Sequence, residues 1–121
     1  MDPREVALIA ANALDDKKGV NILVLNVGGL TVLCDYFVIA SGRSTNQVRS
    51  LIEAVDEKLS AQGITPRRTE GVNEGRWAVL DYGNVMVHLF HREERAYYGL
   101  DRLWNDGSNA LDLPFDQSVP D

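Results

Sequence analysis

The stretch RWAVLDYGNVMVHLFH, residues 76–91, predicts a β-hairpin around which the rest of the chain can be arranged. Two apolar runs flank the pair Gly83-Asn84, and a glycine-asparagine pair between such runs is typical of a tight hairpin turn. Directly opposed residues of two antiparallel strands lie on the same face of the sheet. A turn at this pair therefore decides which side chains of the hairpin share a face.

One predicted face of the hairpin is mostly apolar, and we expect it to meet the core. It pairs Tyr82 with Val85, Leu80 with Val87, and Ala78 with Leu89. The other face pairs Trp77 with Phe90, Val79 with His88, and Asp81 with Met86. Two interpretations of this second face stay open. Either a helix covers it and its polar groups need partners, or it is an apolar surface with polar specificity groups, which marks a protein-binding site.

The flanking segments alternate between helical and strand patterns. The helical segments carry apolar stripes at helical spacing, whereas the strands are short apolar runs, as expected of strands that are buried on both faces. In chain order the pattern predicts a helix over 2–18, strands over 21–27 and 35–41, a helix over 41–63, an edge strand around 66–69, the hairpin, and a helix over 92–104. We expect this last helix to bury Ala96, Leu100, Leu103 and Trp104.

The order α-β-β-α-(β)-β-β-α predicts an α+β fold with a single mixed β-sheet of four to five strands flanked by helices. The length of 121 residues suits one hydrophobic core, and we place the domain at residues 1–104. Residues 105–121 are polar and acidic, which predicts a flexible C-terminal tail. The alternative is that Leu111, Leu113 and Phe115 pack back onto the domain.

Composition narrows the class of protein. No apolar run approaches the roughly 20 residues of a membrane span, and the N-terminus has no features of a signal or transit peptide, so we expect a cytoplasmic protein. The single cysteine, Cys34, excludes an internal disulfide. The net charge of −6 repels phosphate, so we expect a basic protein surface as the partner and little or no contact with nucleic acid. Stacking of single-stranded RNA on Trp77, Tyr82 and Phe90 is a weaker interpretation.

Few residues suit metal or nucleophilic chemistry. A structural zinc site needs about four cysteine or histidine ligands, whereas the chain offers Cys34, His88 and His91. The two histidines stand three positions apart on one strand and so point to opposite faces. Ser41 and Ser44 flank a predicted strand-to-helix turn, but the Gly-x-Ser-x-Gly elbow of hydrolases is absent. We therefore expect no metal site and no catalytic residue.

Phosphate chemistry is the stronger enzymatic alternative. The turn between the strand over 35–41 and the following helix ends at a helix N-terminus, where an anion can bind, and nucleotidyltransferases share this arrangement. Those enzymes also hold metal ions with two or three carboxylates. The predicted strands offer only Asp35 and Asp81, and neither has an acid two positions away. A nucleotide-binding or nucleotidyltransferase-like enzyme stays open as the alternative function.

Four motifs stand in a fixed order along the chain. They are DYFVIASGRSTNQV at 35–48, EG at 70–71, WAVLDYGNVMVHLF at 77–90 and YYGLDRLW at 97–104. Together they resemble the ribosomal silencing factor family, also called RsfS or Iojap-like proteins, over most of residues 3–104. The resemblance implies a nucleotidyltransferase-like fold without catalytic acids, which agrees with the missing carboxylates.

The resemblance also implies a non-enzymatic regulator of translation without a cofactor. Family members bind the large ribosomal subunit through its ribosomal protein fourteen, sterically block joining of the small subunit, and so repress translation when nutrients are limiting. The family's contact surface, carried over to this sequence, includes Trp77, Asp81, Tyr82 and Gly83, with His88 and Phe90 nearby. A homodimer formed through the same apolar face is an open possibility.

Physical roles can be assigned to four of these residues. We expect Trp77 and Phe90 to bury apolar area in the complex. Asp81 would accept hydrogen bonds from a basic residue of the ribosomal protein, and Gly83 would let the turn approach that protein closely.

Overall fold

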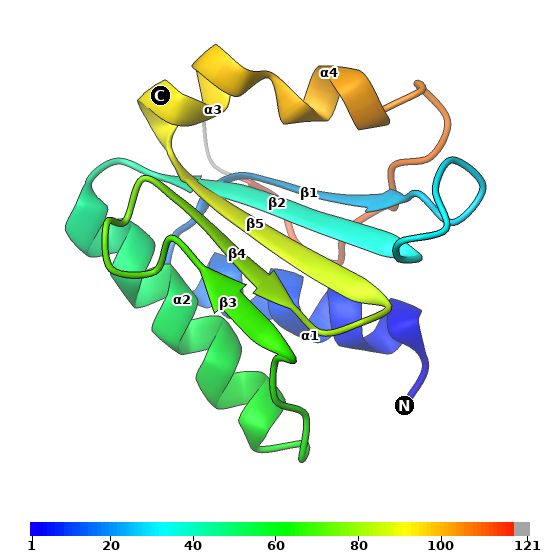
Figure 1. The fold of residues 1–121 in the computed structure, drawn as a ribbon, viewed down its shortest axis with the longest axis horizontal. Helices are drawn as coiled ribbons and strands as arrows, with labels where there is room; N and C mark the ends of the chain where they lie inside the picture. The colour runs from blue at the N-terminus through cyan, green and yellow to red at the C-terminus, as the bar shows by residue number, and fades with distance from the viewer. Residues whose placement is uncertain (118–121) are drawn as a thin grey trace.

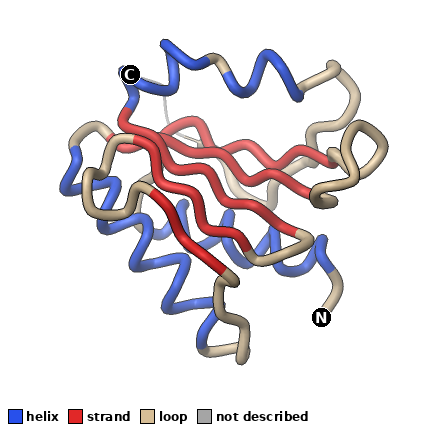
Figure 2. The backbone as a smooth tube through the Cα atoms, in the orientation of Figure 1, coloured by secondary structure: helices blue, strands red, loops and turns tan. Residues whose placement is uncertain are grey.

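The computed structural model describes residues 1–117 of the chain, and it shows a five-stranded sheet between two layers of helices (Figure 1, Figure 2). The elements are α1 (Pro3–Asp16), β1 (Val20–Asn26), β2 (Tyr36–Gly42), α2 (Thr45–Ser60), β3 (Arg68–Glu70), β4 (Trp77–Asp81), β5 (Val85–His91), α3 (Arg92–Tyr98) and α4 (Leu100–Trp104). The strand order is β1-β2-β5-β4-β3, in which β2 and β5 are parallel and the other neighbours antiparallel. Helices α1 and α2 cover one face, and α3 and α4 lie over the other (Figure 1). The predicted α+β class with one mixed sheet is confirmed.

Capping residues fix where the two long helices begin. The Asp2 carboxylate accepts a hydrogen bond from the backbone N–H of Glu5 at 2.9 Å, which caps α1. Ser44 caps α2 by accepting from the backbone N–H of Gln47 at 3.1 Å. The Gln47 side chain reaches back and accepts from the backbone N–H of Arg43 at 2.6 Å. These contacts set the start of each helix and thereby the face that it turns to the sheet.

The β4–β5 hairpin has the predicted register. Trp77 pairs with Phe90, Ala78 with Leu89, Val79 with His88, Leu80 with Val87, and Asp81 with Met86. The aliphatic face of the hairpin is buried in the main core, together with side chains of α1 and α2 such as Leu14, Leu51 and Leu59. The expectation that this face meets the core is therefore confirmed.

The prediction of one continuous helix over residues 92–104 is wrong. Gly99 adopts a left-handed conformation with φ of +60°, so it ends α3 and a second short helix, α4, follows. The predicted buried stripe changes accordingly. Leu100 and Trp104 are half-buried against the sheet, whereas Ala96 is exposed and Leu103 keeps 75% of its surface open to solvent.

The C-terminal segment runs along the outer edge of β1. The backbone N–H of Leu111 donates to the carbonyl of Val24 at 2.9 Å, and the Gln117 side chain both accepts from and donates to the backbone of Ile22, at 2.6 and 2.8 Å. The apolar side chains of this segment that pack against the main core are Leu111, Leu113 and Phe115. The alternative that these three side chains pack back onto the domain is therefore the one that the structure shows. The division of the chain at residue 104 stays a prediction, and the tail's last residues, 118–121, lie outside the described part.

We expect the Gln117→Ala variant to loosen the edge of β1, because it removes both hydrogen bonds between the Gln117 amide and the Ile22 backbone. Hydrogen exchange of the Ile22 amide, followed by NMR, should become about tenfold faster. Asp116→Ala, at the exposed neighbouring position, is the matched control and should leave that rate unchanged. Equal exchange rates in the two variants would show that Gln117 does not hold β1.

Candidate docking site

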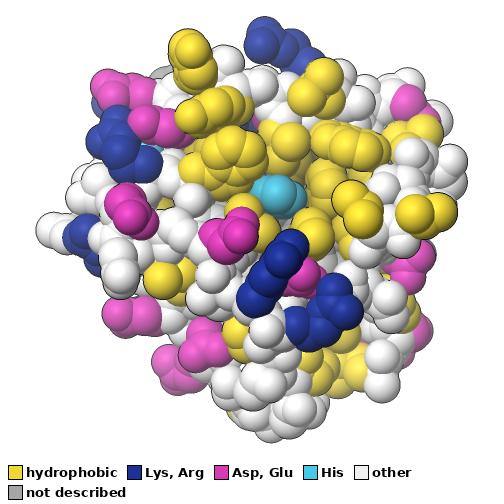
Figure 3. Space-filling model, viewed as in Figure 1, with side chains coloured by type: hydrophobic (Ala, Val, Ile, Leu, Met, Phe, Trp, Pro, Cys, Tyr) yellow, Lys and Arg dark blue, Asp and Glu magenta, His cyan; other side chains and the backbone are white. Residues whose placement is uncertain are grey.

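The second face of the sheet is covered only in part: α3 and α4 lie over some of it, and the rest is an open, largely apolar surface. Under α3 and α4 lies a small apolar layer that includes the fully buried side chains of Phe90 and Ile39. Half-buried side chains pack around this layer, among them Trp77, Met86 and Trp104. Figure 3 shows apolar side chains gathered on this open part of the face, with a histidine among them. We call this open area, which Trp77, Met86, His88 and Trp104 line, the docking face.

Trp77 stands at the centre of an aromatic cluster. Its ring stacks on Phe90, with centroids 5.0 Å apart and an interplanar angle of 25°. Tyr98 of α3 lies against it at 4.7 Å, and Tyr97 contacts Tyr98 edge-on at 5.1 Å. Such aromatic pairs add to the stability that burial of their area already provides. The cluster therefore holds a half-buried tryptophan in one orientation at the surface.

His88 lies beside Trp77 on β5 and is almost fully buried, with 6% of its surface exposed. Its Nδ1 accepts a hydrogen bond from the Trp77 indole N–H at 3.3 Å. Phe37 contacts the imidazole edge-on at 4.8 Å. Burial lowers the pKa of His88 to about 4, so the ring is neutral at physiological pH. The Nε2 atom is buried and has no hydrogen-bond partner among the described residues.

Asp81 ends β4 and is buried, with all its polar contacts inside the chain. One carboxylate oxygen accepts from the backbone N–H of Gly83 at 2.8 Å, which shapes the hairpin turn, where Gly83 has a φ of +89°. The other oxygen forms ion pairs with Arg67 at 3.4 Å and Arg68 at 3.6 Å, whose side chains are about two-thirds exposed. The structure thus gives Asp81 a structural role and places two guanidinium groups beside the docking face (Figure 3).

The six predicted contact residues do not form one surface. Trp77, His88 and Phe90 touch one another, whereas Asp81 and Gly83 lie at the turn. Tyr82 packs into the main core on the other side of the sheet, where burial raises the pKa of its hydroxyl to about 12. Phe90 is fully buried, so it supports Trp77 from beneath and offers no surface of its own. The contact role of all six stays a prediction.

Two exposed apolar groups escaped the sequence analysis. The loop between β1 and β2 leaves Val32 fully exposed and Leu33 68% exposed, and α3 and α4 expose Tyr97 and Leu103. A signal for the loop was present, because aliphatic residues are unusual in a short connection that begins with glycines. The exposure of Leu103 depends on the break at Gly99, for which the glycine itself was the local signal.

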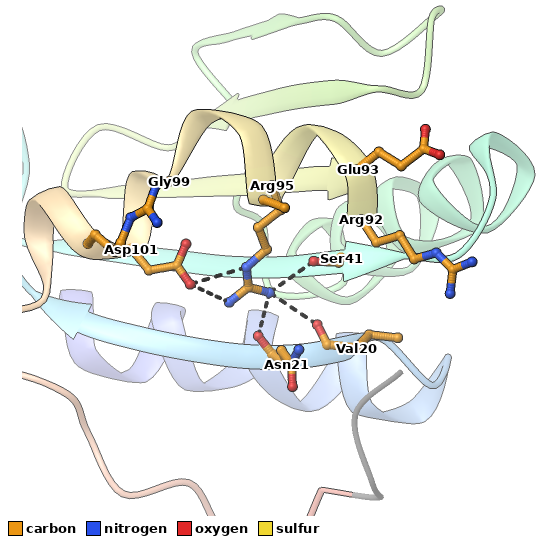
Figure 4. Close-up of a pocket in the computed structure, with 10 residues that line it drawn as sticks. Val20, Asn21, Ser41, Arg92, Glu93, Arg95, Gly99 and Asp101 are labelled. Atoms are coloured by element: carbon orange, nitrogen blue, oxygen red, sulfur yellow. Dashed lines mark hydrogen bonds and ion pairs between the residues drawn. The ribbon is translucent and has the colours of Figure 1, made fainter.

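The serines considered for phosphate chemistry are engaged within the fold. The Ser44 hydroxyl caps α2. The Ser41 hydroxyl accepts from Arg95, which also donates to the carbonyls of Val20 at 3.2 Å and Asn21 at 2.6 Å (Figure 4). Arg95 lies in a cavity of about 530 Å³ between α3, α4 and the start of β1.

The charge of Arg95 is balanced inside this cavity. Its guanidinium forms an ion pair with Asp101 of α4 at 3.0 Å, and only 11% of the Arg95 side chain is exposed. Because the donors of Arg95 are directed at the chain itself, this residue ties α3 and α4 to the edge of the sheet (Figure 4).

Other side chains that could bind a metal ion or react are occupied by contacts within the fold or made unreactive by burial. His91 Nδ1, Glu93 and Glu94 lie close together, but His91 Nδ1 accepts from the backbone N–H of Glu93 as the cap of α3. Arg76 neutralises both glutamates, at 3.4 and 2.6 Å. Burial raises the pKa of the Cys34 thiol to about 11, which keeps it protonated and unreactive.

Fold and site together define the class: a small α+β protein with one five-stranded mixed sheet and a partly open aromatic face. Within the described residues, no helix is long and apolar enough to span a membrane.

Comparison with known proteins identifies the family. The sequence matches the family described as "Ribosomal silencing factor during starvation" over residues 1–120, which includes the C-terminal segment. It is 41% identical over 106 residues to ribosomal silencing factor RsfS of Halalkalibacterium halodurans, covering 88% of this chain and 91% of the relative. It is 40% identical over 115 residues to the RsfS of Bacillus subtilis, covering 95% and 97%. A solved structure from Chromobacterium violaceum has a TM-score of 0.84 at 32% identity, covering 99% of this chain and 98% of that one. The chain belongs to the ribosomal silencing factor family.

We expect the Arg95→Ala variant to lose about 2–3 kcal/mol in free energy of unfolding, because it removes the ion pair with Asp101 and the hydrogen bonds that Arg95 donates to two backbone carbonyls. Urea denaturation followed by circular dichroism measures this loss. Arg102→Ala, on the exposed side of α4, is the matched control and should change stability by less than about 0.5 kcal/mol. Similar unfolding midpoints for both variants would contradict the role of Arg95.

The buried His88 should also make stability depend on pH. The unfolded chain takes up a proton near pH 6.5, whereas the folded protein does so only near pH 4. The neutral imidazole therefore contributes its full stability above pH 6.5, and this contribution falls as the pH drops toward 4, by ~3 kcal/mol in all.

The His88→Asn variant lacks this titration and serves as the reference. We expect the difference in free energy of unfolding between the natural chain and His88→Asn to shrink between pH 7 and pH 4. The measurement is urea denaturation at a series of pH values. A difference that stays constant over this range would contradict the lowered pKa.

Proposed function

We propose that this protein is a non-enzymatic translation repressor that binds the large ribosomal subunit through large-subunit ribosomal protein fourteen. Bound there, it sterically blocks joining of the small subunit and so reduces translation in the cytoplasm when nutrients are limiting. The observation that carries the proposal is the docking face, on which Trp77 is held partly exposed in an aromatic cluster. Membership of the ribosomal silencing factor family supports it.

The docking face has the chemistry of a protein-binding surface. Tryptophan is among the residue types most enriched at binding hot spots, and Phe90 and His88 hold Trp77 in place before the partner arrives. This prior ordering lowers the entropy cost of association. Leu103 and Leu33 are exposed apolar side chains on α4 and on the β1–β2 loop, whose neighbouring residues Trp104 and Cys34 belong to the apolar layer of this face, and we propose that the partner buries them as well.

Charge supports a protein partner with a basic surface. The net charge of −6 favours approach to a basic protein and opposes binding to RNA through phosphate contacts. Arg67 and Arg68 place positive charge at the turn end of the docking face, although Asp81 offsets part of it. We propose that these arginines contact acidic or carbonyl groups of the protein partner at the rim of the interface.

The enzymatic alternative lacks a supporting observation. Nucleotidyl transfer needs carboxylates that are free to hold metal ions, but the Asp81 carboxylate already accepts from Gly83 and pairs with two arginines. The Ser41 and Ser44 hydroxyls are bound to Arg95 and Gln47.

A second copy of the chain could occupy the same docking face. A homodimer formed in this way would compete with the ribosomal subunit, since both partners would bury Trp77. Sedimentation at several protein concentrations, with and without large subunits, separates the two assemblies.

We expect the Trp77→Ala variant to bind isolated large ribosomal subunits at least about tenfold more weakly, because a buried tryptophan anchor is typically worth about 2 kcal/mol or more. Leu103→Glu should also weaken binding, and it should fold normally because the Leu103 side chain is three-quarters exposed. Co-sedimentation with purified subunits measures both effects.

Tyr36→Ala is the matched control for Trp77→Ala. Tyr36 is likewise a half-buried aromatic residue, but it packs against the main core on the opposite side of the sheet. This variant should bind subunits as tightly as the natural chain once folding is confirmed by circular dichroism. If folded Trp77→Ala and Leu103→Glu proteins also bind with natural affinity, the docking face is not the ribosome-binding surface.

A further inference from the structure

One buried polar atom of the docking face has no partner inside the chain. Among the described residues, two buried side-chain atoms lack a hydrogen bond: the Tyr82 hydroxyl and His88 Nε2. The Tyr82 hydroxyl lies with the main core, on the side of the sheet that α1 and α2 cover. His88 belongs to the opposite face, which carries Trp77. A buried polar atom without a partner costs stability. A histidine at this place therefore costs stability unless a group outside the described chain pairs with its Nε2 atom.

The contact with Trp77 fixes what His88 can offer. The indole N–H of Trp77 can only donate, so the His88 Nδ1 that it meets at 3.3 Å must be the unprotonated nitrogen. The ring is neutral because burial keeps its pKa low. The single ring proton then lies on Nε2. His88 thus presents one N–H donor that nothing else in the described chain uses.

The side chains around this donor are apolar, and some of them can change conformation easily. Phe37 packs against the edge of the imidazole at 4.8 Å, and Met86 and Trp104 pack half-buried around the same layer. The unbranched methionine side chain changes conformation at low cost. The residue keeps 6% of its surface exposed although its Nε2 atom is buried, so a partner reaches the donor only when it displaces these side chains.

We propose that His88 is a contact residue of the docking face and donates its Nε2–H to a neutral carbonyl oxygen of the partner protein. This inference rests on the proposed function of that face. A carbonyl is favoured over a carboxylate or a phosphate, because a charged acceptor would lose its hydration in this apolar layer without gaining a counter-charge. The nearby cations, Arg67 and Arg68, lie against Asp81 at the turn end of the hairpin, and their contacts are with the rim of the interface.

Such a donor gives the docking face specificity. A protein surface that matches the apolar area but offers no carbonyl opposite His88 would leave the buried Nε2–H unpaired, and its binding would be weaker for that reason. A partner with the carbonyl satisfies the donor in a place from which water is excluded. His88 would therefore select among apolar partners that Trp77 alone could not distinguish.

Two pairs of proteins isolate the donor in a binding experiment with isolated large ribosomal subunits. His88→Asn places an amide oxygen near the Nδ1 position and can still accept from Trp77, but it has no group at the Nε2 position. The binding of His88→Asn is compared with that of the natural chain.

The second pair is His88→Gln and His88→Phe. His88→Gln carries an amide nitrogen that reaches the Nε2 position, while His88→Phe fills the ring volume without any donor. Both of these lose the acceptor for Trp77, so they are compared with each other.

We expect His88→Asn to bind large subunits about tenfold more weakly than the natural chain, with the NMR signal of the Trp77 indole N–H unchanged. His88→Phe should bind about tenfold more weakly than His88→Gln, although its thermal unfolding temperature should not be lower. Equal affinities within both pairs would overturn the role of His88. If Trp77→Ala loses binding in that case, the proposed function stands and only this inference falls. If Trp77→Ala binds as the natural chain does, the docking face itself is wrong.

Discussion

The register of the β4–β5 hairpin is the constraint on which both faces of the molecule depend. Pairing Leu80 with Val87 places aliphatic side chains under α1 and α2, and the same register places Trp77 beside Phe90 on the opposite face. A slip of one residue would move every side chain of a strand to the other face. Because β5 also pairs in parallel with β2 in the middle of the sheet, the slip would spread to both core layers. The docking face and the main core are therefore specified together.

The second layer depends on a contact of a different kind. Helices α3 and α4 are short and contain no fully buried residue, so burial of their own apolar area holds them only weakly. Arg95 compensates by donating to two carbonyls at the start of β1, to Ser41 on β2 and to Asp101 on α4. The hydrogen bonds of this nearly buried guanidinium have fixed directions, and so they determine where the two helices lie over the sheet. The extent of that cover decides how much of Trp77 stays open.

Local patterns predicted the elements and the hairpin register, because capping residues and alternation act over a few neighbouring positions. Features that depend on distant contacts were not predictable in this way. The packing of Leu100 and Trp104 on the sheet is one such feature, and the Gln117 side chain, which replaces a strand backbone beside Ile22, is another. The break at Gly99 did have a local signal, because a left-handed glycine commonly ends a helix. In the candidate site, the contact of Trp77 with Phe90 followed from the register. The ion pairs of Asp81 did not, since Arg67 and Arg68 come from a separate edge strand and the loop before it.

A partly covered face reconciles two opposing physical demands. If α3 and α4 were absent, Phe37 and Phe90 would join Trp77 in a large exposed apolar area, which promotes unspecific association. If the helices covered the face completely, no partner could reach the tryptophan. The observed cover buries Phe90 fully and leaves Trp77 half-exposed, so the anchor rests on a rigid support and is already fixed by its bond to His88. A side chain that is ordered before docking loses little conformational entropy on binding, and this ordering comes from contacts within the chain itself.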